Sequence, residues 1–185
     1  NSRSADFAVP VPPQQSQFLP AMPPLTLPSS VVRSGVVAAN NGNAAQVQAS
    51  ASVRITVTNP AITVKQTVSL SPAGCSSDVS LLAPVGANVY RCITLTNTGD
   101  TPLTSHELAI SNSPGISATF PLTQTINQND QVVLTSASPA DLPQTAFVFA
   151  PAQTTTSTVG VKSLTAEGFS AAATSSSTVN VGTAA

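Results

Sequence analysis

The chain has 185 residues and a formal net charge of −1, and only 7% of its residues are charged, against about 25% in an ordinary soluble domain. Its six basic side chains are too few to follow a phosphate backbone, so we exclude nucleic acid as a partner. No apolar stretch reaches the roughly 18 residues that a spanning helix needs, so we expect no membrane span.

Residues 1–29 differ in composition from the rest of the chain, because seven of the first 28 residues are proline. Proline lacks an amide hydrogen and fixes φ, so this segment is predicted to be an extended, polyproline II-like arm. Its apolar side chains are too frequent for a solvated linker. We therefore expect the arm to dock on another subunit, through Phe7, Val9, Val11, Phe18 and Leu19.

From residue 30 onward, apolar residues recur at every second position, which is the period of a β-strand. Turn-forming residues separate these runs, as at 97–100 and 112–115. Short strands between turns are typical of a sandwich or barrel, and we find no convincing helix. The strands expected after residue 60 lie at 62–70, 89–95, 103–110, 131–134, 147–149, 154–165 and 175–181.

Two segments share a pattern and suggest an internal repeat. Residues 30–57 and 156–181 each read as a β-hairpin, with Gly42 and Val53 spaced like Gly168 and Val179. At that offset Ile55 corresponds to Val181. The alternative is that the two segments resemble each other by chance, since sequences rich in Ala, Ser and Val align easily. If the first hairpin is real, it packs either on its own domain or on a neighbouring subunit by strand addition.

The chain has two cysteines, Cys75 and Cys92. In a secreted protein an even pair of this kind suggests a disulfide; the alternative is two buried thiols. Two cysteines and one histidine are too few for a zinc site, and we expect no metal and no cofactor.

Further pieces of sequence carry a family resemblance. They are the strand 62–70, the step from Gly86 to Tyr90, the cysteine pair, and the run Thr94–Leu103, which contains Thr-Asn-Thr-Gly-Asp. Together they resemble the conserved-repeat domain of bacterial cell-surface proteins, also called domain of unknown function eleven, over about residues 60–182. The resemblance implies an immunoglobulin-like sandwich outside the cell, usually in tandem, with a structural or adhesive role and no active site. It also makes residues 30–58 look like the tail of a preceding domain, whereas the proline-rich arm departs from the family pattern.

Few residues suggest chemistry. His106 is the only histidine, and no Gly-x-Ser-x-Gly nucleophile elbow accompanies it, so we read it as a surface or half-buried imidazole. The seven carboxylates are scattered and read as turn formers, although Asp78, Asp100 and Asp130 could meet around a calcium ion. Lys65 and Asn180 occupy the first and last strands, as in self-formed isopeptide bonds, but their parity points them outward. We predict no catalytic residues and no enzyme.

These observations predict an all-β protein: an arm (1–29), a hairpin (30–58) that either packs on its own chain or is donated to a neighbouring subunit, and an immunoglobulin-like antiparallel sandwich (59–185). The expected function is that of a secreted, cell-surface subunit of a filament, sheath or layer. It would polymerise with copies of itself through its arm and hairpin. The alternative is a monomeric adhesin with a proline-rich spacer, and a contact with cell wall or glycan stays open.

Overall fold

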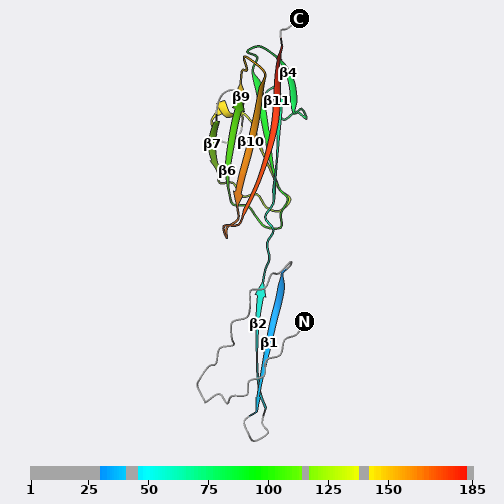
Figure 1. The fold of residues 1–185 in the computed structure, drawn as a ribbon, viewed down its shortest axis with the longest axis vertical. Helices are drawn as coiled ribbons and strands as arrows, with labels where there is room; N and C mark the ends of the chain where they lie inside the picture. The colour runs from blue at the N-terminus through cyan, green and yellow to red at the C-terminus, as the bar shows by residue number, and fades with distance from the viewer. Residues whose placement is uncertain (1–29, 41–45, 114–116, 138–141, 183–185) are drawn as a thin grey trace. The chain divides into compact units, whose positions relative to one another are not determined.

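The computed structural model describes residues 30–40, 46–113, 117–137 and 142–182. Its contacts divide the chain into two compact units, residues 1–57 and 58–185. Strands dominate the described residues, whose one helical segment is a single 3₁₀ turn, η1 (Gln144–Ala146). The prediction of an all-β protein is therefore confirmed (Figure 1).

The described part of the first unit is a β-hairpin. Strand β1 (Val31–Asn40) pairs antiparallel with β2 (Gln46–Ile55) over ten residue pairs, from Val31 opposite Ile55 to Asn40 opposite Gln46. The hydroxyl of Ser30 closes the open end of the hairpin, since it accepts a hydrogen bond of 2.8 Å from the amide of Val57.

The second unit contains two sheets. The larger has five strands in the order β4 (Ser80–Pro84), β11 (Ser170–Gly182), β10 (Thr155–Leu164), β6 (Ser105–Ser113) and β7 (Ser117–Leu122). Most neighbours are antiparallel, but β4 runs parallel to β11. The expected antiparallel sandwich is therefore a mixed one at this edge.

The smaller sheet has the order β3 (Ile62–Ser69), β5 (Val89–Asn97) and β8 (Gln131–Leu134), and β9 (Val148–Phe149) also pairs with β5. Alternate side chains of the two sheets meet in a main apolar core, which includes Ile93, Leu95, Leu108 and Val159. This is the sandwich that the period-two pattern predicts. The immunoglobulin-like topology stays a prediction.

The strand at 131–134 lies where the sequence placed it. The strand expected at 103–110 instead spans 105–113 and runs through the predicted turn at Asn112. The side-chain amide oxygen of Asn112 accepts a hydrogen bond of 2.6 Å from Arg91. A residue type that favours turns therefore lies within a strand here and binds a buried side chain. Strands β4 and β7 were not predicted, and β11 begins at Ser170 rather than at 175.

Candidate functional site

His106 is buried, with 5% of its surface exposed, which corrects the expectation of a surface or half-buried ring. Its Nε2 lies 2.9 Å from the carbonyl oxygen of Gln124, and its Nδ1 lies 2.7 Å from the hydroxyl of Ser163. Because a carbonyl only accepts, Nε2 carries the proton and Nδ1 accepts from Ser163. Desolvation lowers the pKa of His106 below its usual 6.5, and the bond to Gln124 opposes that shift. The Ser163 hydroxyl is fully buried, so this pair links two strands rather than facing solvent.

The other candidates for chemistry remain apart. Among the residues that the structure describes, no three His, Cys, Asp or Glu side chains gather closely enough to hold a metal ion. Asp100 accepts a hydrogen bond of 2.7 Å from the amide of Asn59, and Asp130 accepts one from the side chain of Asn127. Lys65 and Asn180 are exposed on different sheets, as their parity predicted.

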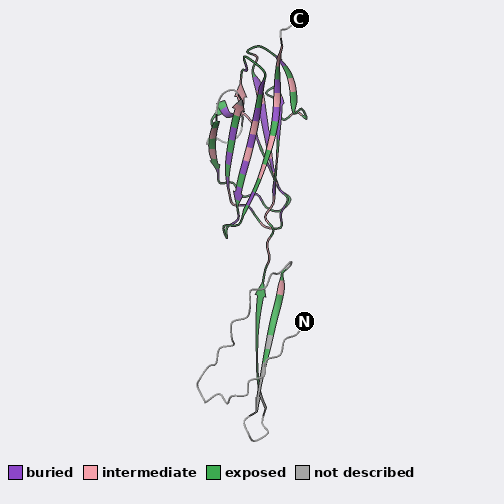
Figure 2. Cartoon of the chain, in the orientation of Figure 1, coloured by how far each residue is buried: buried purple, intermediate pink, exposed green. Residues whose placement is uncertain are grey.

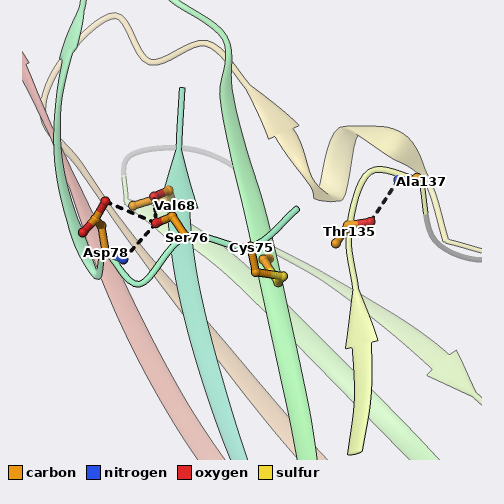
Figure 3. The surroundings of a disulfide bond; sticks show 7 residues. Val68, Cys75, Ser76, Asp78, Thr135 and Ala137 are labelled. Carbon is orange, nitrogen blue, oxygen red and sulfur yellow. Dashed lines mark hydrogen bonds between the residues drawn. A yellow bond between two sulfur atoms is a disulfide. The ribbon is translucent and has the colours of Figure 1, made fainter. Parts of the chain in front are cut away.

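Cys75 and Cys92 form the expected disulfide, with their Cα atoms 5.4 Å apart. The bond ties the loop after β3 to the middle of β5 (Figure 3). In the same loop the hydroxyl of Ser76 donates to the carbonyl of Val68 at 2.9 Å, and it accepts from the amide of Asp78 at 2.8 Å. The disulfide and these hydrogen bonds fix the chain that leads into β4.

Arg91 is a buried cation that sequence reasoning missed. It is 2% exposed and donates to three neutral acceptors, namely the carbonyl of Ala146, Asn112 Oδ1 at 2.6 Å and Ser157 Oγ at 2.7 Å. Burial lowers the pKa of Arg91 to about 10, which still leaves it charged at neutral pH. These partners lie on β6, on β10 and at the last residue of η1, so the guanidinium, which comes from β5, joins the two sheets. A cavity of about 190 Å³ adjoins it, between Ile110, Phe120 and Pro143.

The hairpin β1–β2 exposes the side chains of both its faces among the described residues. None of its described side chains is buried, whereas the strands of the sandwich bury alternate residues (Figure 2). An isolated two-stranded hairpin is marginally stable at best in water, so such an element normally needs a cover. The five predicted docking residues, Phe7, Val9, Val11, Phe18 and Leu19, lie outside the described residues.

The two faces of the hairpin differ in chemistry. Residues directly opposite in an antiparallel pair share a face, so the register of β1 and β2 sorts the side chains by parity. The odd-numbered face carries Val31, Ala49, Ala51, Val53 and Ile55, with Arg33 as its one polar side chain among those described. The even-numbered face carries mainly polar residues, namely Ser34, Gln48, Ser50, Ser52 and Arg54, with Val32 and Val36.

The hairpin β10–β11 provides the reference for this pattern. It also pairs ten residues with ten across a five-residue connection, from Thr155 opposite Val179 to Leu164 opposite Ser170. By register Ile55 therefore corresponds to Val179, not to Val181 as the sequence suggested. Both offsets are even, so the faces still correspond. The odd face of β10–β11 is the one turned into the core, with Val159, Val161 and Val179 buried. The first hairpin thus has a core-type face that the described residues leave uncovered.

Comparison with known proteins adds no relative. No family model matches the chain, and no curated protein matches it. Within the described residues, no helix is long and apolar enough to cross a membrane.

Proposed function

We propose that this protein is an extracellular structural subunit that assembles with copies of itself into a filament, sheath or surface layer. The hairpin β1–β2 of one copy is the donor element, and the sandwich of the next copy is the acceptor. The proline-rich arm adds apolar contacts to the same junction through the five residues predicted above.

One observation carries this proposal, which is the uncovered odd face of the hairpin. Val53 is 57% exposed, whereas its counterpart by register in β10–β11, Ser177, is 3% exposed. Ala51 and Val53 of the first hairpin correspond to Ser175 and Ser177 of the second, so this part of the face is more apolar than in the hairpin that the sandwich buries. An apolar face with unpaired strand edges promotes association until it is covered.

The compartment is supported by the disulfide, because such bonds persist in oxidising surroundings outside the cytosol. The low content of charge also suits close packing of subunits, since a buried and unpaired charge is costly. Among the described residues of the hairpin, only Arg33 and Arg54 are charged.

The test is sedimentation of the full chain over a wide range of concentration, with electron microscopy of the product. Val53→Asp places a carboxylate on the apolar face. Burying it unpaired costs more than about 1.4 kcal/mol, so we expect the dissociation constant to rise at least about tenfold. Ser52→Asp is the matched control, because Ser52 is exposed on the other face, one residue away.

Assembly by the parent chain and by Ser52→Asp, with loss of assembly by Val53→Asp, supports the proposal. A parent chain that stays monomeric at every concentration would refute it and favour the adhesin. Equal behaviour of the two variants would remove the hairpin face from the interface. Deleting residues 1–28 measures the contribution of the arm, and unchanged assembly after that deletion would show that the arm does not dock.

A further inference from the structure

We propose that the hairpin of one copy adds to the outer edge of β4 in the next copy, where the exposed apolar side chains in and beside β4 and the carboxylate of Asp78 receive it. This inference rests on the proposed function and names the acceptor that the function requires. The edges and exposed side chains of the sandwich single out β4 among the available surfaces.

Besides the two-residue β9, four described strands lie at the ends of the two sheets of the sandwich, and they differ as acceptors. The outer edge of β3 is partly occupied, because Val68 donates its amide to the carbonyl of Asp78 and Gln66 donates its amide to Ser175. Strand β7 contains Pro121 inside the strand, whereas the proline of β4, Pro84, is the last residue of that strand; neither has an amide hydrogen to donate. Strand β8 has four residues, one fewer than β4. The outer edge of β4, in contrast, pairs with no strand of the described chain.

The segment around β4 also exposes large apolar side chains. Val79, Leu82 and Val85 are 51%, 70% and 61% exposed, and they fall within seven consecutive residues. The other side of the strand is anchored, since Ala83 is buried in a small core with Val68, Val89 and Val179. A strand added at this edge gains backbone hydrogen bonds, and its apolar side chains cover those of β4. That combination is the one by which strand addition gives both affinity and register.

Charge distinguishes hairpin-on-sandwich contact from hairpin-on-hairpin contact. Residues 30–57 carry two arginines and no carboxylate, whereas residues 58–185 carry six carboxylates and three cationic side chains, of which Arg91 is buried. Two hairpins facing each other would bring like charges together, but a hairpin on the sandwich brings opposite charges together. Asp78 is exposed two residues before β4 begins, and the described hydrogen bonds of its carboxylate come from the hydroxyls of Ser76 and Ser77. Arg33, on the apolar face of the hairpin, supplies the matching cation.

The same residue argues against a swap, in which the hairpin would replace β10–β11 of another copy. By register Arg33 takes the position of Ser157, whose hydroxyl accepts a hydrogen bond from buried Arg91. Replacement would bury two guanidinium groups side by side, which is strongly unfavourable. Addition at a free edge leaves Arg33 at the rim.

The position of β4 then sets the form of the assembly. The second unit begins at Thr58 and its chain enters the sandwich at one end, whereas β4 pairs with the last five residues of β11 at the other end (Figure 1). Donor and acceptor are different surfaces, so the contact is heterologous. Repetition of such a contact gives an open chain of subunits unless the rotation happens to close it.

The experiment uses a blocked acceptor, Leu82→Asp, beside the blocked donor, Val53→Asp, in the full chain, with folding checked by thermal unfolding. Each variant alone should sediment as a monomer. A mixture should form one-to-one dimers and nothing larger, because it contains one working hairpin and one working edge per pair. Thr174→Asp, which is exposed on β11 outside the stretch that pairs with β4, should assemble like the parent.

A charge exchange tests the register. Arg33→Glu and Asp78→Lys should each weaken assembly severalfold, and the double variant should recover most of the loss. Asp78→Asn removes the negative charge but keeps a side-chain oxygen that accepts a hydrogen bond from the loop serines, so it measures the effect of the charge alone.

If Leu82→Asp assembles normally while Val53→Asp does not, the acceptor lies elsewhere and the proposed function stands. If neither variant affects assembly, both proposals are wrong. A mixture that stays monomeric, or a parent chain that compacts without associating, overturns the β4 acceptor.

Discussion

The run Asn97–Asp100, which carried much of the family resemblance, works by fixing where the chain enters the sandwich. The side chain of Asn97 is fully buried and donates to the carbonyls of Thr101 at 2.8 Å and Ile126 at 2.9 Å. The amides of Thr98 and Gly99 both donate to the carbonyl of Ala61. The short polar residues of this run therefore satisfy the backbone groups of a tight crossing of two segments.

Gly99 is the position at which this crossing tolerates no side chain. A Cβ there would lie 2.6 Å from the carbonyl oxygen of Asn59 and even closer to the amide nitrogen of Ala61. Both are backbone atoms that cannot turn away. We expect Gly99→Ala to lower the free energy of unfolding by about 2 kcal/mol or more, measured by urea denaturation. Gly74→Ala is a useful comparison, because it has open space around its Cβ but a positive φ. A Gly99→Ala variant as stable as the parent would show that the crossing can relax.

His106 should make stability depend on pH. Its folded-state pKa lies below the unfolded value of about 6.5, so between those two values the unfolded chain binds more protons than the folded one. The free energy of unfolding therefore falls as the pH drops from about 6.5 toward the lowered pKa, and it is unaffected by this group above that window. Urea denaturation at pH 7.5, 6.5 and 5.5 measures the slope. His106→Gln should flatten it, and an unchanged slope in that variant would assign the pH dependence to another group.

At the scale of elements, the sequence predicts strands well where polar turns bracket an alternating run. Strand β8 is an example, since the polar residues 127–130 precede it. Strand β4 was not predicted, because Leu81 and Leu82 are adjacent apolar residues, one facing the core and the other solvent, so the sequence shows no alternation there. Burial of Arg91 and His106 was also not predictable from spacing. Their polar groups are satisfied by residues 18 to 66 positions away, which only the folded sheets bring together.

The candidate site was partly visible in the sequence for the same reason. A shift of two residues in the alignment of the two hairpins leaves each residue on the same face of its strand. The hairpin and its apolar face could therefore be predicted, although the exact pairing of residues could not. The correspondence between the two hairpins depends on which residues of β10 pair with which residues of β11, and a sequence rich in Ala, Ser and Val does not specify this. The acceptor edge was invisible, because an edge is a property of the sheet order rather than of the strand.

At the scale of the whole molecule, the uneven distribution of charge predicts how assembly responds to salt. The hairpin is cationic, and the exposed charges of the sandwich are mostly carboxylates, including Asp78, Asp100, Glu107, Asp130 and Glu167. Attraction between exposed charges is screened over about 8–10 Å at moderate ionic strength. If Arg33 meets Asp78, screening removes an interaction worth roughly 0.2–1 kcal/mol. We therefore expect the dissociation constant to rise by up to about fivefold between 0.05 and 0.5 M NaCl.

The apolar part of the same contact responds differently, which makes the salt series informative. Burial of Val53 and Leu82 does not depend on screening, so assembly should weaken with salt but persist. Arg33→Gln should show weaker assembly at low salt and little further change as salt rises, because its hairpin has lost the screened interaction. Sedimentation of both proteins across the series measures this. A parent chain whose assembly strengthens with NaCl, or an Arg33→Gln variant that keeps the full salt dependence, would contradict the charge pairing and leave apolar burial as the force that joins the subunits.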